Sequence, residues 1–251
     1  MRIVALIAAI ATTVVLGGCA HPISIAPNLA SIDTKTSLPE KVKAKIAYYI
    51  PQESLNREVT TPGGGGDNVR YFPYRDAEVG YEKMLSNTFE TVVKRTQPAG
   101  SNKVLDGDTN FLLEPELITI SGSTGFFTWP PTNFSVDMTS RVRDLSGKLV
   151  GSPRVLGAAS VEGIFDMKGN HGITGQNAME DALQKMQASL VEFFRDLLNG
   201  GSPSASPTLR SGRNAVSQTE ERLVGLRALL EKGLINTDEY EKKRKDILND
   251  H

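Results

Sequence analysis

The sequence predicts an α+β protein in which two helices cover one face of a roughly four-stranded, antiparallel-rich sheet, with a separate helical pair at the C-terminal end. Two observations lead to this fold class. Apolar and polar residues alternate over several short segments, as in half-buried strands, whereas apolar residues recur at helical spacing over longer ones. The order along the chain is strand, helix, three strands, helix, which suits helices packed on a mainly antiparallel sheet.

The composition is that of an ordinary globular protein. Of the 251 residues, 39% are hydrophobic and 23% are charged, and the formal net charge is −1. This balance predicts no strongly basic surface for nucleic acid. The chain has 1 cysteine, which rules out an intramolecular disulfide bond.

The first 18 residues have the order of an export signal. Arg2 precedes an apolar run over 3–16, and the small pair Gly17-Gly18 follows it. The run is short for a spanning helix, which needs roughly 20 apolar residues. We therefore expect residues 1–18 to be a cleaved signal peptide, and a retained membrane anchor is the alternative.

The residues Leu16-Gly17-Gly18-Cys19 resemble a bacterial lipobox. The resemblance implies cleavage between Gly18 and Cys19, diacylglycerol on the Cys19 thiol and commonly a third acyl chain, such as palmitate, on its amine. Two or more chains hold a protein stably on membrane lipid, because each buried CH₂ contributes about 0.8 kcal/mol. Ala20 replaces the aspartate that retains enteric lipoproteins at the inner membrane, which implies the periplasmic face of the outer membrane.

Changes in composition predict the domain boundaries. Residues 19–40 are rich in Pro, Ser, Thr and Asn without helical periodicity, and we expect them to form a tether. The folded domain is predicted over 41–199. A Gly/Ser/Pro linker over 200–218 then leads to a second unit over 219–251.

Within the main domain, a strand is predicted over 42–50 by strict alternation, and a helix over 76–95 by the spacing of Tyr81, Leu85 and Phe89. The short polar connection 144–148 predicts an antiparallel hairpin between the last two strands. The remaining predicted elements are strands over 111–120, 133–143 and 154–163 and a helix over 177–198.

Local signals refine these elements. The run Gly63-Gly64-Gly65-Gly66 lacks the Gly-Lys-Ser/Thr ending of a nucleotide loop, so it predicts a surface loop. Asn177 and Glu180 have the spacing of a capping pair for the last helix. Small residues on the last strand predict a helix packed close to it; they are Gly157, Ala158, Ala159 and Gly163.

This element order is similar to that of small periplasmic adaptor lipoproteins, such as the lipopolysaccharide-assembly lipoprotein and the auxiliary lipoproteins of ABC-type transport systems. The likeness implies binding of protein partners. The connection over 122–133 carries Phe126, Phe127 and Trp129, which we expect to form a partner-docking patch or to enter a membrane interface. The alternative is that these aromatics fold back over the end of the sheet.

The segment 219–251 reads as two short helices separated at Gly233, with Asn236 as the cap of the second. It resembles the short C-terminal domain called SHOCT, from which it departs by Asn236 in place of threonine. The resemblance implies oligomerisation or other protein contacts. The residues that carry it are Leu229, Leu230, Gly233, Leu234, Ile235, Glu239, Tyr240, Lys243 and Leu248.

No motif predicts an enzyme. The histidines, His21, His171 and His251, lack metal-ligand spacing, and no nucleophile elbow or nucleotide loop occurs. We therefore expect no catalytic residue, no metal and no cofactor. Two functions stay open: a lipid-anchored adaptor or assembly factor, and a periplasmic protein that holds a lipid or another small ligand between sheet and helices.

Overall fold

The computed structural model describes residues 20–64, 66–98, 109–123, 129–144, 146–161 and 169–200. The chain divides into two units, residues 1–205 and 206–251, and the described residues belong to the first. The predicted signal peptide, Cys19 and the predicted SHOCT module therefore lie outside the described residues.

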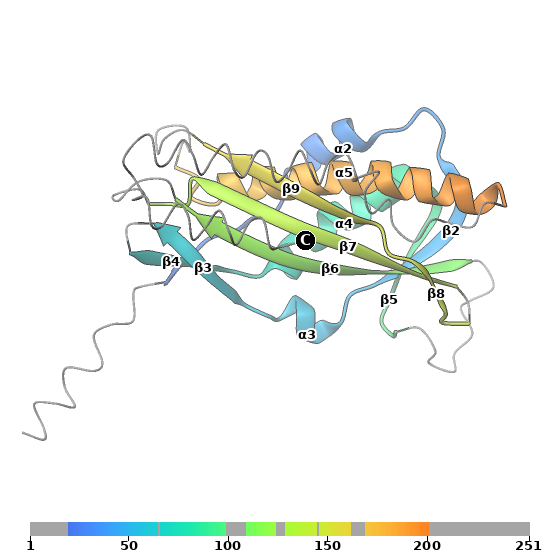
Figure 1. Cartoon of the computed structure of the whole chain (residues 1–251), viewed down its shortest axis with the longest axis horizontal. Coiled ribbons are helices and arrows are strands. Elements are labelled where there is room, and N and C mark those ends of the chain that lie inside the picture. The colour runs from blue at the N-terminus through green and yellow to red at the C-terminus, as the bar shows by residue number, and fades with distance from the viewer. Residues whose placement is uncertain are drawn as a thin grey trace, which may run out of the picture. The chain divides into compact units, whose positions relative to one another are not determined.

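A mixed sheet of six strands forms the centre of the domain (Figure 1). Its order is β5–β2–β6–β7–β8, and β9 also pairs with β7. β2 is parallel to β5 and to β6, whereas β7 is antiparallel to β6, β8 and β9. The strands are β2 (Val42–Tyr49), β5 (Phe89–Arg95), β6 (Phe111–Gly122), β7 (Asn133–Asp144), β8 (Leu149–Gly151) and β9 (Arg154–Ser160).

One face of this sheet is covered by helices. α4 (Pro73–Thr88) and α5 (Ile173–Leu198) pack on it, and α2 (Leu29–Thr36) packs on both helices. β7 shows the resulting alternation, because Phe134, Val136 and Met138 are buried on its helix side. The predicted α+β class is thus confirmed, but the counts differ from the prediction: the described residues form sheets of six and three strands and four helices.

The close approach of α5 to β9 explains why position 157 is a glycine. A Cβ added to Gly157 would collide with the carbonyl oxygen of Ala178 and the backbone nitrogen of Ala182 in α5. Ala158 points to the opposite, exposed face of β9. The expected close packing of a helix on this strand is therefore present at Gly157, whereas Gly163 lies outside the described residues.

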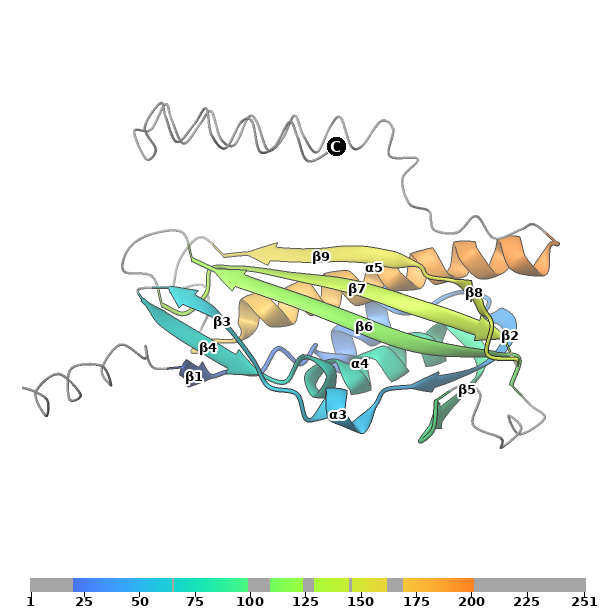
Figure 2. The same cartoon turned by 60° about the horizontal axis from the view of Figure 1, so that its bottom comes forward.

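A second sheet of three strands stands beside the first, in the order β1–β4–β3 (Figure 2). β3 (Val59–Gly64) and β4 (Asp67–Tyr71) form a hairpin, and β1 (Ala20–Pro22) runs parallel to β4. Gly64 and Gly66, with φ angles of 105° and 90°, provide the left-handed backbone of the turn. The glycine run expected as a loop is therefore partly strand and partly hairpin turn.

The prediction of a tether over 19–40 is wrong for residues 20–36, which are built into the domain. Ile25 and Ile32 have no exposed surface. The Ile25 amide donates to a carboxylate oxygen of Asp76 in α4 at 2.8 Å. Short elements without a long periodic pattern fold here because tertiary contacts bury their few apolar residues.

The helix predicted over 76–95 also needs correction. It begins earlier, at Pro73, and ends at Thr88, after which Phe89–Arg95 continues as β5 along the edge of the main sheet. Pro73 suits a first helical turn, where its missing N–H costs nothing. The β-branched residues Thr91, Val92 and Val93 favour the strand.

The capping pair predicted for the last helix is wrong, because α5 begins four residues earlier than Asn177, at Ile173. The Glu180 side chain, 7% exposed, binds α2 instead: it accepts from the Asn28 amide at 3.0 Å and from Ser31 and Lys35 at 2.6 and 3.1 Å. Burial opposes its ionisation, but these hydrogen bonds outweigh burial and hold the pKa of Glu180 below its ordinary value.

Candidate functional site

The structure describes some of the predicted site residues and not others. Trp129 is described, whereas Gly18, Cys19, Phe126 and Phe127 lie outside the described residues. The predicted SHOCT positions also lie outside them: Leu229, Leu230, Gly233, Leu234, Ile235, Glu239, Tyr240, Lys243 and Leu248.

Trp129 lies half-buried at the end of the domain where β1 begins. Its ring is stacked at a tilt against His21, with centroids 4.5 Å apart, and meets the His171 ring edge-on at 5.7 Å. A Cβ on Gly63 would come within 3.0 Å of the indole, so Trp129 also packs over the tip of β3. This position fits the alternative in which the tryptophan folds back on the sheet.

The same cluster brings together two histidines that the sequence places 150 positions apart. His21 Nε2 lies 3.2 Å from a carboxylate oxygen of Asp67, which begins β4. Both side chains are 41% exposed. His21 and His171 therefore form one aromatic cluster with Trp129.

A groove forms on the other side of the main sheet, where β2 and β6 separate. These strands pair only from Ile46↔Phe111 to Tyr48↔Leu113, and β6 then continues away from β2. The Leu117 amide beyond this point donates to the Tyr74 hydroxyl at 3.0 Å. Pro115, two residues earlier on the same strand edge, has no N–H. Neither residue can therefore donate a backbone hydrogen bond to an added strand.

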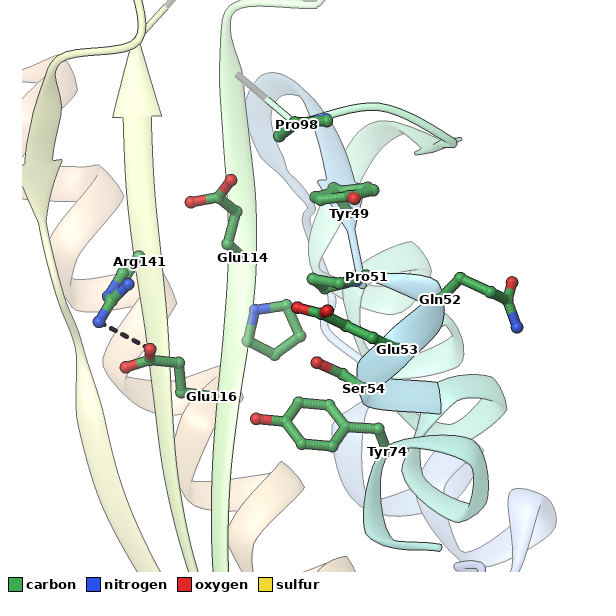
Figure 3. Close-up of a pocket in the computed structure, with 11 residues that line it drawn as sticks. Tyr49, Pro51, Gln52, Glu53, Ser54, Tyr74, Pro98, Glu114, Glu116 and Arg141 are labelled. Atoms are coloured by element: carbon green, nitrogen blue, oxygen red, sulfur yellow. Dashed lines mark ion pairs between the residues drawn. The ribbon is translucent and has the colours of Figure 1, made fainter. Parts of the chain in front are cut away.

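Figure 3 shows this groove between β6 and α3 (Gln52–Leu55). Its volume is about 600 Å³. Tyr49, Pro51 and Tyr74 line its α3 side, whereas Glu114, Glu116 and Arg141 come from β6 and β7. The lining residues are Tyr49, Pro51, Gln52, Glu53, Ser54, Tyr74, Pro98, Glu114, Pro115, Glu116 and Arg141.

Most of the charges along the groove are paired within the sheet. An Arg141 guanidinium nitrogen lies 2.6 Å from a Glu116 carboxylate oxygen, and Arg143 lies 2.8 Å from Glu114. Glu53 projects from α3 and is exposed. The groove thus combines apolar rings with a modest excess of negative charge.

The groove contains carboxylates, tyrosines and one serine, but no histidine or cysteine beside them. Among the described residues, no group of three or more His, Cys, Asp or Glu side chains could hold a metal ion.

The helix α4 packs tightly against the main sheet. Between α4 and the sheet, the enclosed space near Tyr81 and Met138 is about 10 Å³, roughly the smallest volume that can hold a water molecule. Buried hydroxyls join the two sheets: Tyr71 donates to Thr119 at 2.8 Å, and Thr61 lies 2.6 Å from Ser121. Burial raises the pKa of Tyr71, so this hydroxyl stays protonated and structural.

Sequence reasoning missed the groove. Its one local signal is Pro115 within an otherwise regular strand, since proline in a sheet is confined to edges and bulges. The separation of β2 from β6 depends on the parallel pairing of strands far apart in sequence, which no local pattern reports.

Comparison with known proteins gives distant likenesses. No protein-family model and no curated protein matches the chain. A Xanthomonas campestris protein of the family DUF330 is 12% identical, over 73% of this chain and 95% of that one, with a TM-score of 0.40. A candidate lipoprotein from Caulobacter crescentus is 13% identical, over 67% and 96%, with a TM-score of 0.33. Likenesses at this distance carry no conclusion about function.

In the described part of the chain, none of the helices combines the length and the apolar character needed to cross a bilayer.

Proposed function

We propose that the chain is a lipid-anchored lipoprotein of the bacterial envelope that acts as a non-catalytic adaptor. Lipid on Cys19 would hold it at the periplasmic face of the outer membrane. The groove on the open face of the sheet would bind a protein partner, and the C-terminal SHOCT module would mediate self-association. The lipobox-like residues 16–19 support the anchor.

The observation that carries the adaptor role is the groove itself. Tyr49 and Tyr74 beside three prolines offer rigid apolar contact at low entropic cost, which suits an extended peptide segment. Pro115 has no N–H, and the Leu117 N–H already donates to Tyr74, so neither can donate to a partner strand at this edge. The partner would therefore dock through side chains. The exposed carboxylate of Glu53 favours a basic residue in that segment.

A small ligand is the second candidate. The enclosed space of about 10 Å³ between α4 and the sheet is too small for such a ligand, which argues against an interior position there. The groove, with about 600 Å³, is large enough for a drug-sized molecule. A ligand of this kind would therefore occupy the same open groove as the peptide.

Photocrosslinking in intact cells separates these candidates. A benzophenone amino acid at position 53 should crosslink one discrete protein, and the same probe at Val79, 55% exposed on α4, should not. Tyr49→Ala should weaken that crosslink without unfolding the domain. Equal crosslinking from both positions would refute the groove as the partner site. A small molecule that co-purifies in native mass spectrometry and is lost in Tyr49→Ala would instead favour the second candidate.

The anchor and the self-association have their own tests. Mass spectrometry of the mature protein should find acylated Cys19 as its first residue, and retention of residues 1–18 would refute the lipoprotein assignment. Deletion of 217–251 should lower the number of chains per particle, obtained by light scattering from the particle mass and the chain mass; an unchanged number would refute self-association through this segment.

The aromatic patch gives a further test of partner contact. If the partner also contacts this patch, replacing Phe126 and Phe127 with serine should spare folding and abolish co-purification of the partner, whereas unchanged co-purification would leave the groove as the contact. Trp129→Ser belongs to the same predicted patch, but its contact with Gly63 makes a moderate loss of stability the expected result.

A further inference from the structure

We infer that the end of the domain formed by β1, the β3–β4 turn and the aromatic cluster of His21, Trp129 and His171 rests directly on the surface of the lipid bilayer. The inference rests on the proposed lipidation of Cys19 and adds an orientation to it.

No linker separates the proposed anchor at Cys19 from the first strand of the domain. Consecutive Cα atoms are about 3.8 Å apart, so Ala20 begins β1 within one residue of the proposed anchor. β1 is held by its register with β4, from Ala20↔Asn68 to Pro22↔Arg70, and by the bond from the Ile23 amide to the Arg70 carbonyl oxygen at 3.0 Å.

The segment that follows β1 is fixed as firmly. Ile25 is fully buried, and a Cβ on Gly175 of α5 would collide with it. The Glu180 carboxylate then holds the start of α2. An acyl anchor on Cys19 would therefore hold one defined end of a rigid domain at the membrane.

The surface at that end suits the headgroup region. Trp129 and the two histidines have amphipathic rings, a type that gathers at membrane interfaces. Around them lie small or uncharged residues of the β3–β4 turn and the neighbouring loop, including Gly64, Gly66 and Asn170. Asp67 is partnered by His21. No long charged side chain among these residues would hold the domain away from the bilayer.

The far end of the domain is correspondingly distant. α5 begins next to His171, and its 26 residues extend it by about 39 Å. Figures 1 and 2 both place its last turn at the end of the domain opposite β1. Leu198, 51% exposed, therefore marks the surface that should lie farthest from the bilayer.

Trp129 fluorescence can test this orientation, because Trp129 is the one tryptophan of the chain. Lipidated protein purified from membranes is reconstituted into vesicles of phosphatidylethanolamine and phosphatidylglycerol, some of which carry a spin-labelled lipid near the headgroup. The spin label should quench Trp129 fluorescence. A variant with about 20 Gly/Ser residues inserted between Cys19 and Ala20, with a root-mean-square reach of about 25 Å, should lose this quenching.

A second variant, Trp129→Phe combined with Leu198→Trp, moves the fluorophore to the far end and should show no quenching by lipid. Acylated Cys19 with equal quenching in the native and spacer proteins would overturn the orientation and leave the proposed anchor standing. Cys19 without lipid on the same sample would overturn both.

Discussion

Replacing Ile25 with alanine tests whether the N-terminal segment belongs to the folded domain. Ile25 is fully buried, against α5 and beside the Asp76-bound backbone. The substitution removes three carbon atoms, worth about 2.4 kcal/mol at 0.8 kcal/mol each. With the cavity left behind, we expect the free energy of unfolding to fall by about 3 to 4 kcal/mol.

Urea unfolding followed by Trp129 fluorescence measures this loss, because the single tryptophan reports on this domain alone. At an m-value of about 2 kcal/mol/M, the midpoint should fall by roughly 1.5 to 2 M. Leu29→Ala is the matched control on the same segment, since Leu29 is 44% exposed, and it should cost about 0.5 kcal/mol or less. Equal small effects of both substitutions would show that the segment is a solvated tether and would refute the reasoning.

Three further substitutions test the packing and electrostatics of the domain. Gly157→Val should destabilise it by roughly 3 kcal/mol, because the new side chain meets α5 backbone, whereas Ala158→Val on the open face should be neutral in the same urea assay. Tyr74→Phe leaves the Leu117 amide without its acceptor and should cost about 1 to 3 kcal/mol; an unchanged midpoint would contradict that hydrogen bond. The lowered pKa of Glu180 means that its ionised form stabilises the fold above its ordinary pKa of 4.5, and that this contribution is lost as the pH falls through the folded value. Glu180→Gln should therefore flatten the fall in stability below pH 4.5 measured by thermal unfolding, and a slope as steep as that of the exposed-site variant Glu40→Gln would contradict this.

The sequence predicts well those parts of the fold that have a long periodic pattern. β7 follows from its alternation, and most of α5 follows from its buried stripe. The sequence predicts helix ends less well, because Phe89, Val92 and Val93 continue the apolar spacing of α4 into β5. The sheet pairing decides where that helix stops, and pairing between distant strands leaves no local trace.

The candidate sites also differ in how far the sequence alone predicts them. Trp129 is recognisable from the sequence as an aromatic residue on a Gly/Pro-rich connection. Its neighbours His21 and His171 are not, since β1 must first pair with β4 to bring His21 beside it. The groove likewise depends on where β6 leaves β2.

The parallel pairing of β1 with β4 decides how the domain would respond to force. Tension between Ala20 and the last turn of α5 would run along the length of β1, so its hydrogen bonds to β4 would bear the load together instead of opening in sequence. Behind them, buried Ile25 and Ile32 would have to leave the core before the chain could lengthen. The domain would therefore resist such a pull as one stiff unit, and its unfolding rate under load would set how long it holds.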